Sequence, residues 1–124
     1  MSVLAAVAGL LMSQALVPPV AVEEAPTTVD VAYAELARGD TMGAIARIEA
    51  NREVSADDPA ALINLGTAHA RLGKWRKAEK LYRAAIASND RYELELADGT
   101  WMDSRRAARI AMAELYKAET LAMR

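Results

Sequence analysis

The chain has 124 residues, with 15 Lys and Arg against 17 Asp and Glu, and 53% of its residues are hydrophobic. This length suits one small domain and argues against a two-domain enzyme. The formal net charge of -2 argues against a surface that is positive throughout, and the lack of cysteine excludes disulfide frameworks, thiolate metal sites and cysteine nucleophiles. Because 28 residues are alanine, which has the highest helix propensity, we expect an all-helical fold.

The N-terminal segment differs in composition from the rest, since every charged side chain lies from Glu23 onward. Residues 3–12 form an apolar run. The segments 13–15 and 19–21 each offer a small residue after which a signal peptidase could cut. We therefore predict a signal peptide over residues 1–21, a linker over 22–28 and export to the periplasm or the medium. A retained anchor and an ordinary helix stay open, because no Lys or Arg precedes the apolar run. Membrane contact is expected only through a retained segment.

Residues 59–88 have the pattern of two helices. Pro59 suits a first helical turn, Asp58 can cap it, and Gly73 can end that helix. Apolar residues then recur at steps of three and four, which places them on one face of each helix: Leu62, Leu65, Gly66, His69 and Leu72, followed by Ala78, Leu81, Tyr82, Ala85 and Ile86. The short connection predicts an antiparallel hairpin.

The spacing within this pair resembles the tetratricopeptide repeat. Leu62-x2-Leu65-Gly66-x2-His69, then Ala78-x3-Tyr82, parallel that family's Trp-x2-Leu-Gly-x2-Tyr and Ala-x3-Phe. A shift of 34 residues upstream places Ala32 on Gly66 and predicts a degenerate first repeat. The resemblance implies helix hairpins of an α-solenoid, with repeats at about 25–58 and 59–90 inside a helical domain over 29–124.

Small residues are expected where the two helices of the second pair cross. Gly66 and Ala78 lack bulk, so Tyr82 and Leu65 can enter the space between the backbones. A larger residue at position 66 is therefore predicted to overpack the crossing.

The C-terminal part predicts one more helix, because repeat proteins need a cover for their last hairpin. Asp103 or Ser104 can cap a helix over about 104–122. Upstream, alternation around Leu94 and the turn signal Asp98-Gly99 predict a short β-hairpin at about 92–102. An alternative role of this helix is self-association through its Ala, Met and Leu face.

Catalysis and metal binding are not expected. His69 is the only histidine, it stands where the resembled family has a packing aromatic, and no second His or Cys can complete a zinc site. The chain carries no nucleophile elbow, phosphate-binding glycine loop or metalloprotease histidine pair. We therefore predict no enzyme activity and no cofactor.

By the same resemblance, first-helix residues line a groove for a peptide or helix of a partner protein. The residues expected to contact that partner are Tyr33, Ile63, Asn64, Thr67 and Arg71. Val29 and Tyr33 stand where the family's chaperone-tail clamp needs Lys and Asn, so that ligand is not expected. The predicted function is a noncovalent protein-interaction scaffold, and cover of the groove by the N-terminal segment or the last helix stays open.

A basic run supports an alternative function. Between Arg71 and Arg83 the only acid is Glu79, and the basic residues that follow Arg71 are Lys74, Arg76, Lys77, Lys80 and Arg83. Such a patch is typical of an adaptor for nucleic acid or an anionic polymer, or of a solvated outer face. An exported protein is not expected to meet nucleic acid.

Overall fold

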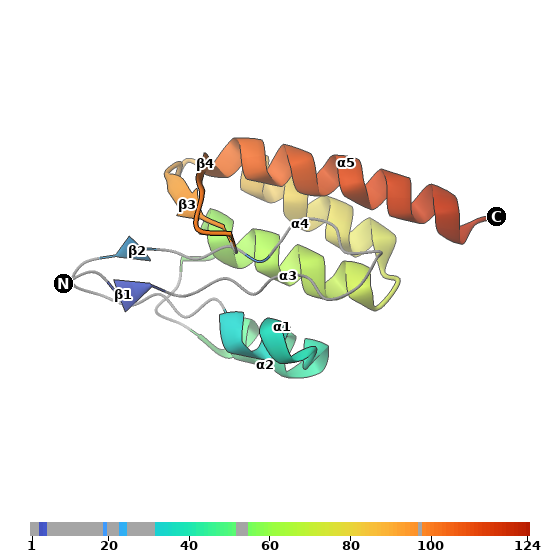
Figure 1. The fold of residues 1–124 in the computed structure, drawn as a ribbon, viewed down its shortest axis with the longest axis horizontal. Coiled ribbons are helices and arrows are strands. Elements are labelled where there is room, and N and C mark those ends of the chain that lie inside the picture. Colours follow the sequence, from blue (N-terminus) through green and yellow to red (C-terminus); the bar gives the residue numbers. More distant parts are fainter. Residues whose placement is uncertain (1–2, 5–18, 20–22, 25–31, 52–54, 97) are drawn as a thin grey trace.

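The structure is a computed structural model that describes residues 3–4, 19, 23–24, 32–51, 55–96 and 98–124 (Figure 1). In these ranges it has five helices: α1 (Tyr33–Arg38), α2 (Thr41–Ala50), α3 (Pro59–Arg71), α4 (Trp75–Ala87) and α5 (Ser104–Ala122). Two antiparallel strand pairs accompany them: β1 (Val3–Leu4) with β2 (Glu23–Glu24), and β3 (Glu93–Glu95) with β4 (Trp101–Asp103). The described part is therefore mostly helical with two small sheets, and the predicted β-hairpin is present.

The helices stack largely in chain order. α1 packs on α2, α2 on α3, and α3 on α4, while α5 lies along α4 and also contacts α3 (Figure 1). An ion pair between Arg47 Nη1 and Glu35 Oε1, at 2.8 Å, joins α2 to α1. α5 is thus the last layer of the described stack, on the side of α4 away from α1 and α2.

Side-chain caps explain where three helices begin. The carboxylates of Asp40, Asp58 and Asp103 each accept a hydrogen bond from a backbone N–H in the first turn of α2, α3 and α5. α1 ends at Gly39, whose φ of 78° lies in the left-handed region that glycine adopts without strain. The predicted start of the third helix, with Asp58 at its N-cap and Pro59 next, is confirmed.

The first hairpin differs from the 34-residue alignment. The alignment places Ala32 inside a helix at the position of Gly66, but Ala32 has φ 61° and precedes the first residue of α1. A left-handed residue cannot continue a right-handed helix, so α1 has only six residues. The prediction that this position repeats Gly66 is therefore wrong.

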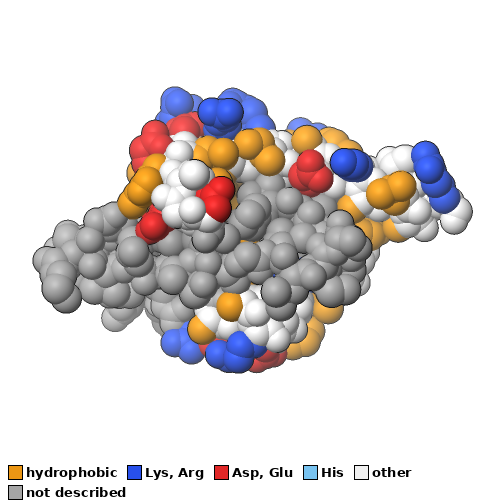
Figure 2. All heavy atoms as spheres, in the orientation of Figure 1, with side chains coloured by type: hydrophobic (Ala, Val, Ile, Leu, Met, Phe, Trp, Pro, Cys, Tyr) orange, Lys and Arg blue, Asp and Glu red, His pale blue; other side chains and the backbone are white. Residues whose placement is uncertain are grey.

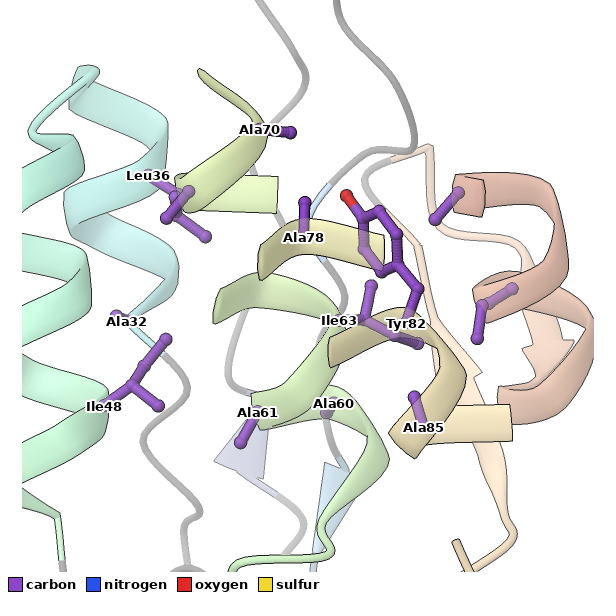
Figure 3. Packing of buried hydrophobic residues seen from close by; sticks show 14 of the residues in the cluster. Ala32, Leu36, Ile48, Ala60, Ala61, Ile63, Ala70, Ala78, Tyr82 and Ala85 are labelled. Atoms are coloured by element: carbon purple, nitrogen blue, oxygen red, sulfur yellow. The ribbon is translucent and has the colours of Figure 1, made fainter. Parts of the chain in front are cut away.

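Tyr82 fills the crossing of α3 and α4. Its side chain is fully buried, and Figure 3 shows it beside Ile63 and Ala78 within the core. A Cβ added to Gly66 would lie 2.6 Å from Tyr82 Cε1, so the ring occupies the space that the missing side chain leaves. The expected insertion of Tyr82 beside Gly66 is confirmed.

The apolar face of α5 is used inside the chain. Ala108, Ala111 and Leu115 are fully buried, and Leu94 of the β-hairpin is buried in the same core. These residues of the Ala, Met and Leu face are therefore not available for the self-association that the sequence raised as an alternative.

Candidate functional site

Most of the predicted peptide groove is not exposed. Ile63, Asn64 and Thr67 are at most 1% exposed, and Thr67 Oγ1 is 3.0 Å from the hydroxyl of Tyr82. These side chains therefore belong to the core. The side chain of Tyr33 lies outside the described residues.

Arg71, the fifth predicted groove residue, is half-buried. Its Nη1 donates a hydrogen bond to the backbone oxygen of Leu36 at 3.0 Å, which ties the end of α3 to α1. Burial lowers the pKa of its guanidinium. Arg71 thus holds two helices together, and the four residues that can be placed do not form an open surface.

Part of the basic run, in contrast, lines an open groove between α4 and α5. Arg76, Lys80 and Arg83 share one face of α4, since they are four and three residues apart. Together with Glu79 of α4 and Glu119 of α5 they line a groove of about 500 Å³. Lys77 is exposed on the same helix but does not line this groove, and Lys74 precedes the first turn.

Hydrogen bonds fix one wall of this groove. Arg83 Nε donates to Glu79 Oε1 at 3.0 Å, and Arg83 Nη2 donates to the hydroxyl of Tyr116 on α5 at 3.1 Å. The bond to Glu79 is the main reason that the pKa of Arg83 is raised above its ordinary value. Arg83 therefore connects the two helices and is not the cation most available to a ligand.

Arg76 and Lys80 are the available cations. Both are exposed, and neither forms an ion pair with another residue that the structure describes. The groove as a whole presents three cations and two carboxylates. This balance suits a ligand that carries spaced carboxylates, whereas a continuous row of phosphates would meet Glu79 and Glu119 with like charge.

A second polar cluster joins α3 to the β-hairpin. The Tyr92 hydroxyl donates to Asp58 Oδ1, and Asp58 Oδ2 accepts from the Ala61 N–H at 2.9 Å. Burial raises the pKa of Asp58, although both hydrogen bonds oppose this shift. Ser88 Oγ also donates to the backbone oxygen of Asp57. Because these groups form hydrogen bonds with one another and Asp58 caps α3, we assign the cluster a structural role.

His69 is 2% exposed, and neither ring nitrogen has a hydrogen-bond partner among the described residues. Burial lowers the pKa of His69, and the positive charges of Lys77 and Lys74 lower it further, against the opposing effect of Glu49. Burial and the two lysines therefore favour the neutral form of the ring. This arrangement agrees with the packing role predicted from the sequence.

Within the ranges that the structure describes, no three His, Asp or Glu side chains are grouped so that they could hold a metal ion. None of the helices described is both long and apolar enough to cross a membrane. The predicted signal peptide falls almost entirely outside the described residues, and within the predicted linker Glu23 and Glu24 form β2. Comparison of the chain with protein-family models, curated proteins and solved structures finds no match.

The sequence pattern did not reveal the α5 wall of the groove. The signal was present, because Tyr116 and Glu119 are three residues apart and so lie on one flank of a helix. That flank could be assigned to the groove only once the packing of α5 along α4 was known.

Proposed function

We propose that this protein is a noncovalent interaction scaffold that binds an acidic segment of a partner protein in the α4–α5 groove. The observation that carries the proposal is the pair of exposed cations, Arg76 and Lys80, inside a groove between two packed helices. Carboxylates of the bound segment would pair with these cations, and the helices would hold the pairs in a fixed geometry.

The mixed charge of the groove favours a protein segment over a polyanion as its ligand. A nucleic acid or another polyanion favours an unbroken positive surface. Here Glu79 neutralises Arg83, and Glu119 adds a second negative charge to the opposite wall. A peptide with spaced acidic side chains is therefore the better fit.

We also propose that the helix pairs are tetratricopeptide-like. Two features support this: the order of hairpin, hairpin and terminal helix, and the entry of Tyr82 beside Gly66. In that family the second helix of each pair lies on the convex side, so α4 would present its groove there. Binding would then use the opposite side of the scaffold from the peptide groove that the resemblance implies.

Charge reversal in the groove tests this proposal. The probe is a fluorescently labelled peptide of alternating Glu and Ala, measured by anisotropy at low and at moderate salt. We expect Arg76→Glu with Lys80→Glu to weaken binding by at least about tenfold. Lys80→Glu alone should also weaken binding, and Lys77→Glu is its matched control, because it makes the same single charge reversal on the same helix outside the groove.

Three outcomes would contradict the proposal: no binding by the unmodified protein, equal loss in the Lys77→Glu control, or tighter binding of a single-stranded oligonucleotide than of the peptide. The last outcome would favour the polyanion adaptor. The salt dependence of the oligonucleotide affinity would then be steep, because phosphate binding releases counterions.

Export is a separate proposal that rests on the uncharged first 22 residues. N-terminal sequencing of the protein recovered outside the cytoplasm tests it. A new N-terminus near residue 22 would support export with cleavage of the signal peptide, an intact Met1 on the exported protein would contradict cleavage, and absence of the protein outside the cytoplasm would contradict export.

A further inference from the structure

One flank of α5 carries a stripe of four residues, three of which are exposed. Ile110, Glu114, Lys117 and Leu121 follow one another at steps of four, three and four residues, so they lie along one line of the helix. Ile110 is 37% exposed and Leu121 is 56% exposed, while Lys117 is exposed and Glu114 half-buried. Within the described chain neither Glu114 nor Lys117 forms an ion pair.

The C-terminal part of α5 extends beyond its neighbours. α5 has 19 residues and α4 has 13, and Figure 1 shows the end of α5 projecting past the α3–α4 hairpin. From Thr120 to the C-terminus every residue is exposed, including Leu121 and Met123. Helical turns without tertiary contacts are marginal in water, so a molecule that covers this end would stabilise it.

We propose that a second copy of this chain packs antiparallel along this stripe. A two-fold axis between positions 115 and 116 places Ile110 opposite Leu121 of the second copy. The same axis places Glu114 opposite Lys117 of the second copy. Each contact occurs twice, as a two-fold interface requires.

The order of residues along the stripe favours this occupant. From Ile110 to Leu121 the stripe is apolar, acidic, basic and apolar, so an antiparallel copy places each acid opposite a base and each apolar residue opposite an apolar one. Figure 2 shows acidic, basic and hydrophobic side chains following one another along α5. In a parallel arrangement Glu114 would face Glu114 and Lys117 would face Lys117, so like charges would oppose. Antiparallel packing also aligns the helix dipoles favourably.

This contact is independent of the α4–α5 groove. At 100° per residue, the stripe and the pair Tyr116 and Glu119 lie on opposite flanks of α5. The dimer would leave both grooves open. The dimer would thus carry two α4–α5 grooves, one from each chain.

The first test is association of the full chain, measured by sedimentation velocity over a series of protein concentrations at low salt. We expect the unmodified chain to dimerise. Glu114→Lys and Lys117→Glu should each lower the association constant at least about tenfold, because each makes all facing charges alike. An equimolar mixture of the two variants should recover association, since opposite charges then face each other.

Glu119→Lys is the matched control, because it makes the same change on the same helix but on the groove flank. It should leave association unchanged, and circular dichroism checks that every variant keeps its helices. A monomeric unmodified chain at the highest concentration would overturn the proposal. So would a mixture that fails to recover, or an equal loss of association in the Glu119→Lys control.

The orientation can be tested separately because the chain has no cysteine. In the antiparallel dimer, Ile110→Cys mixed with Leu121→Cys should form a disulfide-linked heterodimer under mild oxidation, in preference to either homodimer. Preferential linkage of Ile110→Cys to itself would indicate a parallel pair and contradict the assigned geometry.

Discussion

Replacement of Gly66 by alanine tests the packing on which the α3–α4 hairpin depends. The new Cβ would lie 2.6 Å from Tyr82 Cε1 and 2.9 Å from Cδ1, where ordinary carbon contacts are about 3.5 to 4.0 Å. Relief of this overlap requires the ring to retreat by about 1 Å. The ring is fully buried, and its hydroxyl is hydrogen bonded to Thr67, so it has little freedom to move.

The expected change in unfolding free energy combines three effects. Overpacking of a buried site costs about 1 to 3 kcal/mol. Loss of the bond between Thr67 and Tyr82 would add about 1 kcal/mol. Alanine in a helix interior recovers about 1 kcal/mol relative to glycine. Gly66→Ala should therefore destabilise the protein by about 1 to 3 kcal/mol, although the substitution favours the helix locally.

Urea unfolding followed by circular dichroism measures this change, and a double-mutant cycle assigns it to the ring. In a Tyr82→Leu background the overlapping ring atoms are absent, so Gly66→Ala should cost much less or stabilise the protein. If the Gly66→Ala variant is as stable as the unmodified protein or more stable, the packing of the Tyr82 ring does not require the absence of a side chain at position 66. An equal cost in both backgrounds would also refute that dependence.

Two further predictions concern buried polar groups. Because the pKa of His69 is lowered in the fold, His69 contributes stability that is present above its ordinary pKa of 6.5 and is lost as the pH falls through the lower folded value. His69→Phe should remove that loss in urea unfolding between about pH 7 and pH 5, whereas an unchanged pH profile would contradict the assignment. Asp58→Ala should cost about 1 to 3 kcal/mol, because it removes the cap of α3 and the acceptor for Tyr92. Asp58→Asn keeps a capping oxygen without a buried charge, so thermal melting should show a much smaller loss of stability than for Asp58→Ala. Equal losses of stability in the two variants would contradict this explanation.

Local chemistry explains why the α3–α4 pair could be predicted from the sequence. The start of α3 depends on Asp58 and Pro59, and its end on Gly73, whose φ of 74° suits glycine. These signals act within a few residues, so they are readable without tertiary structure. The contact of Tyr82 with Gly66 followed because a bulky residue and a missing side chain face each other at the crossing.

The binding surface could not be predicted in the same way. Ile63, Asn64 and Thr67 lie on the first helix of their pair, but whether that face is open depends on what packs over it. Helical periodicity gives the direction in which a side chain points relative to its neighbours and not what it meets there. The structure was therefore needed to show that this face of α3 is buried and that the basic face of α4 is exposed.

The two acids of α5 show the same limit and set the order of the experiments. Glu114 and Glu119 are five residues apart, and nothing local distinguishes them. The buried residues Ala111 and Leu115 fix the rotation of the helix, which places Glu119 in the groove and Glu114 on the opposite flank. Charge reversal at these two positions should then separate two functions, with peptide binding sensitive to position 119 and association sensitive to position 114. If both readouts respond equally to either change, the rotation assigned to α5 is wrong, and both surfaces must be assigned anew.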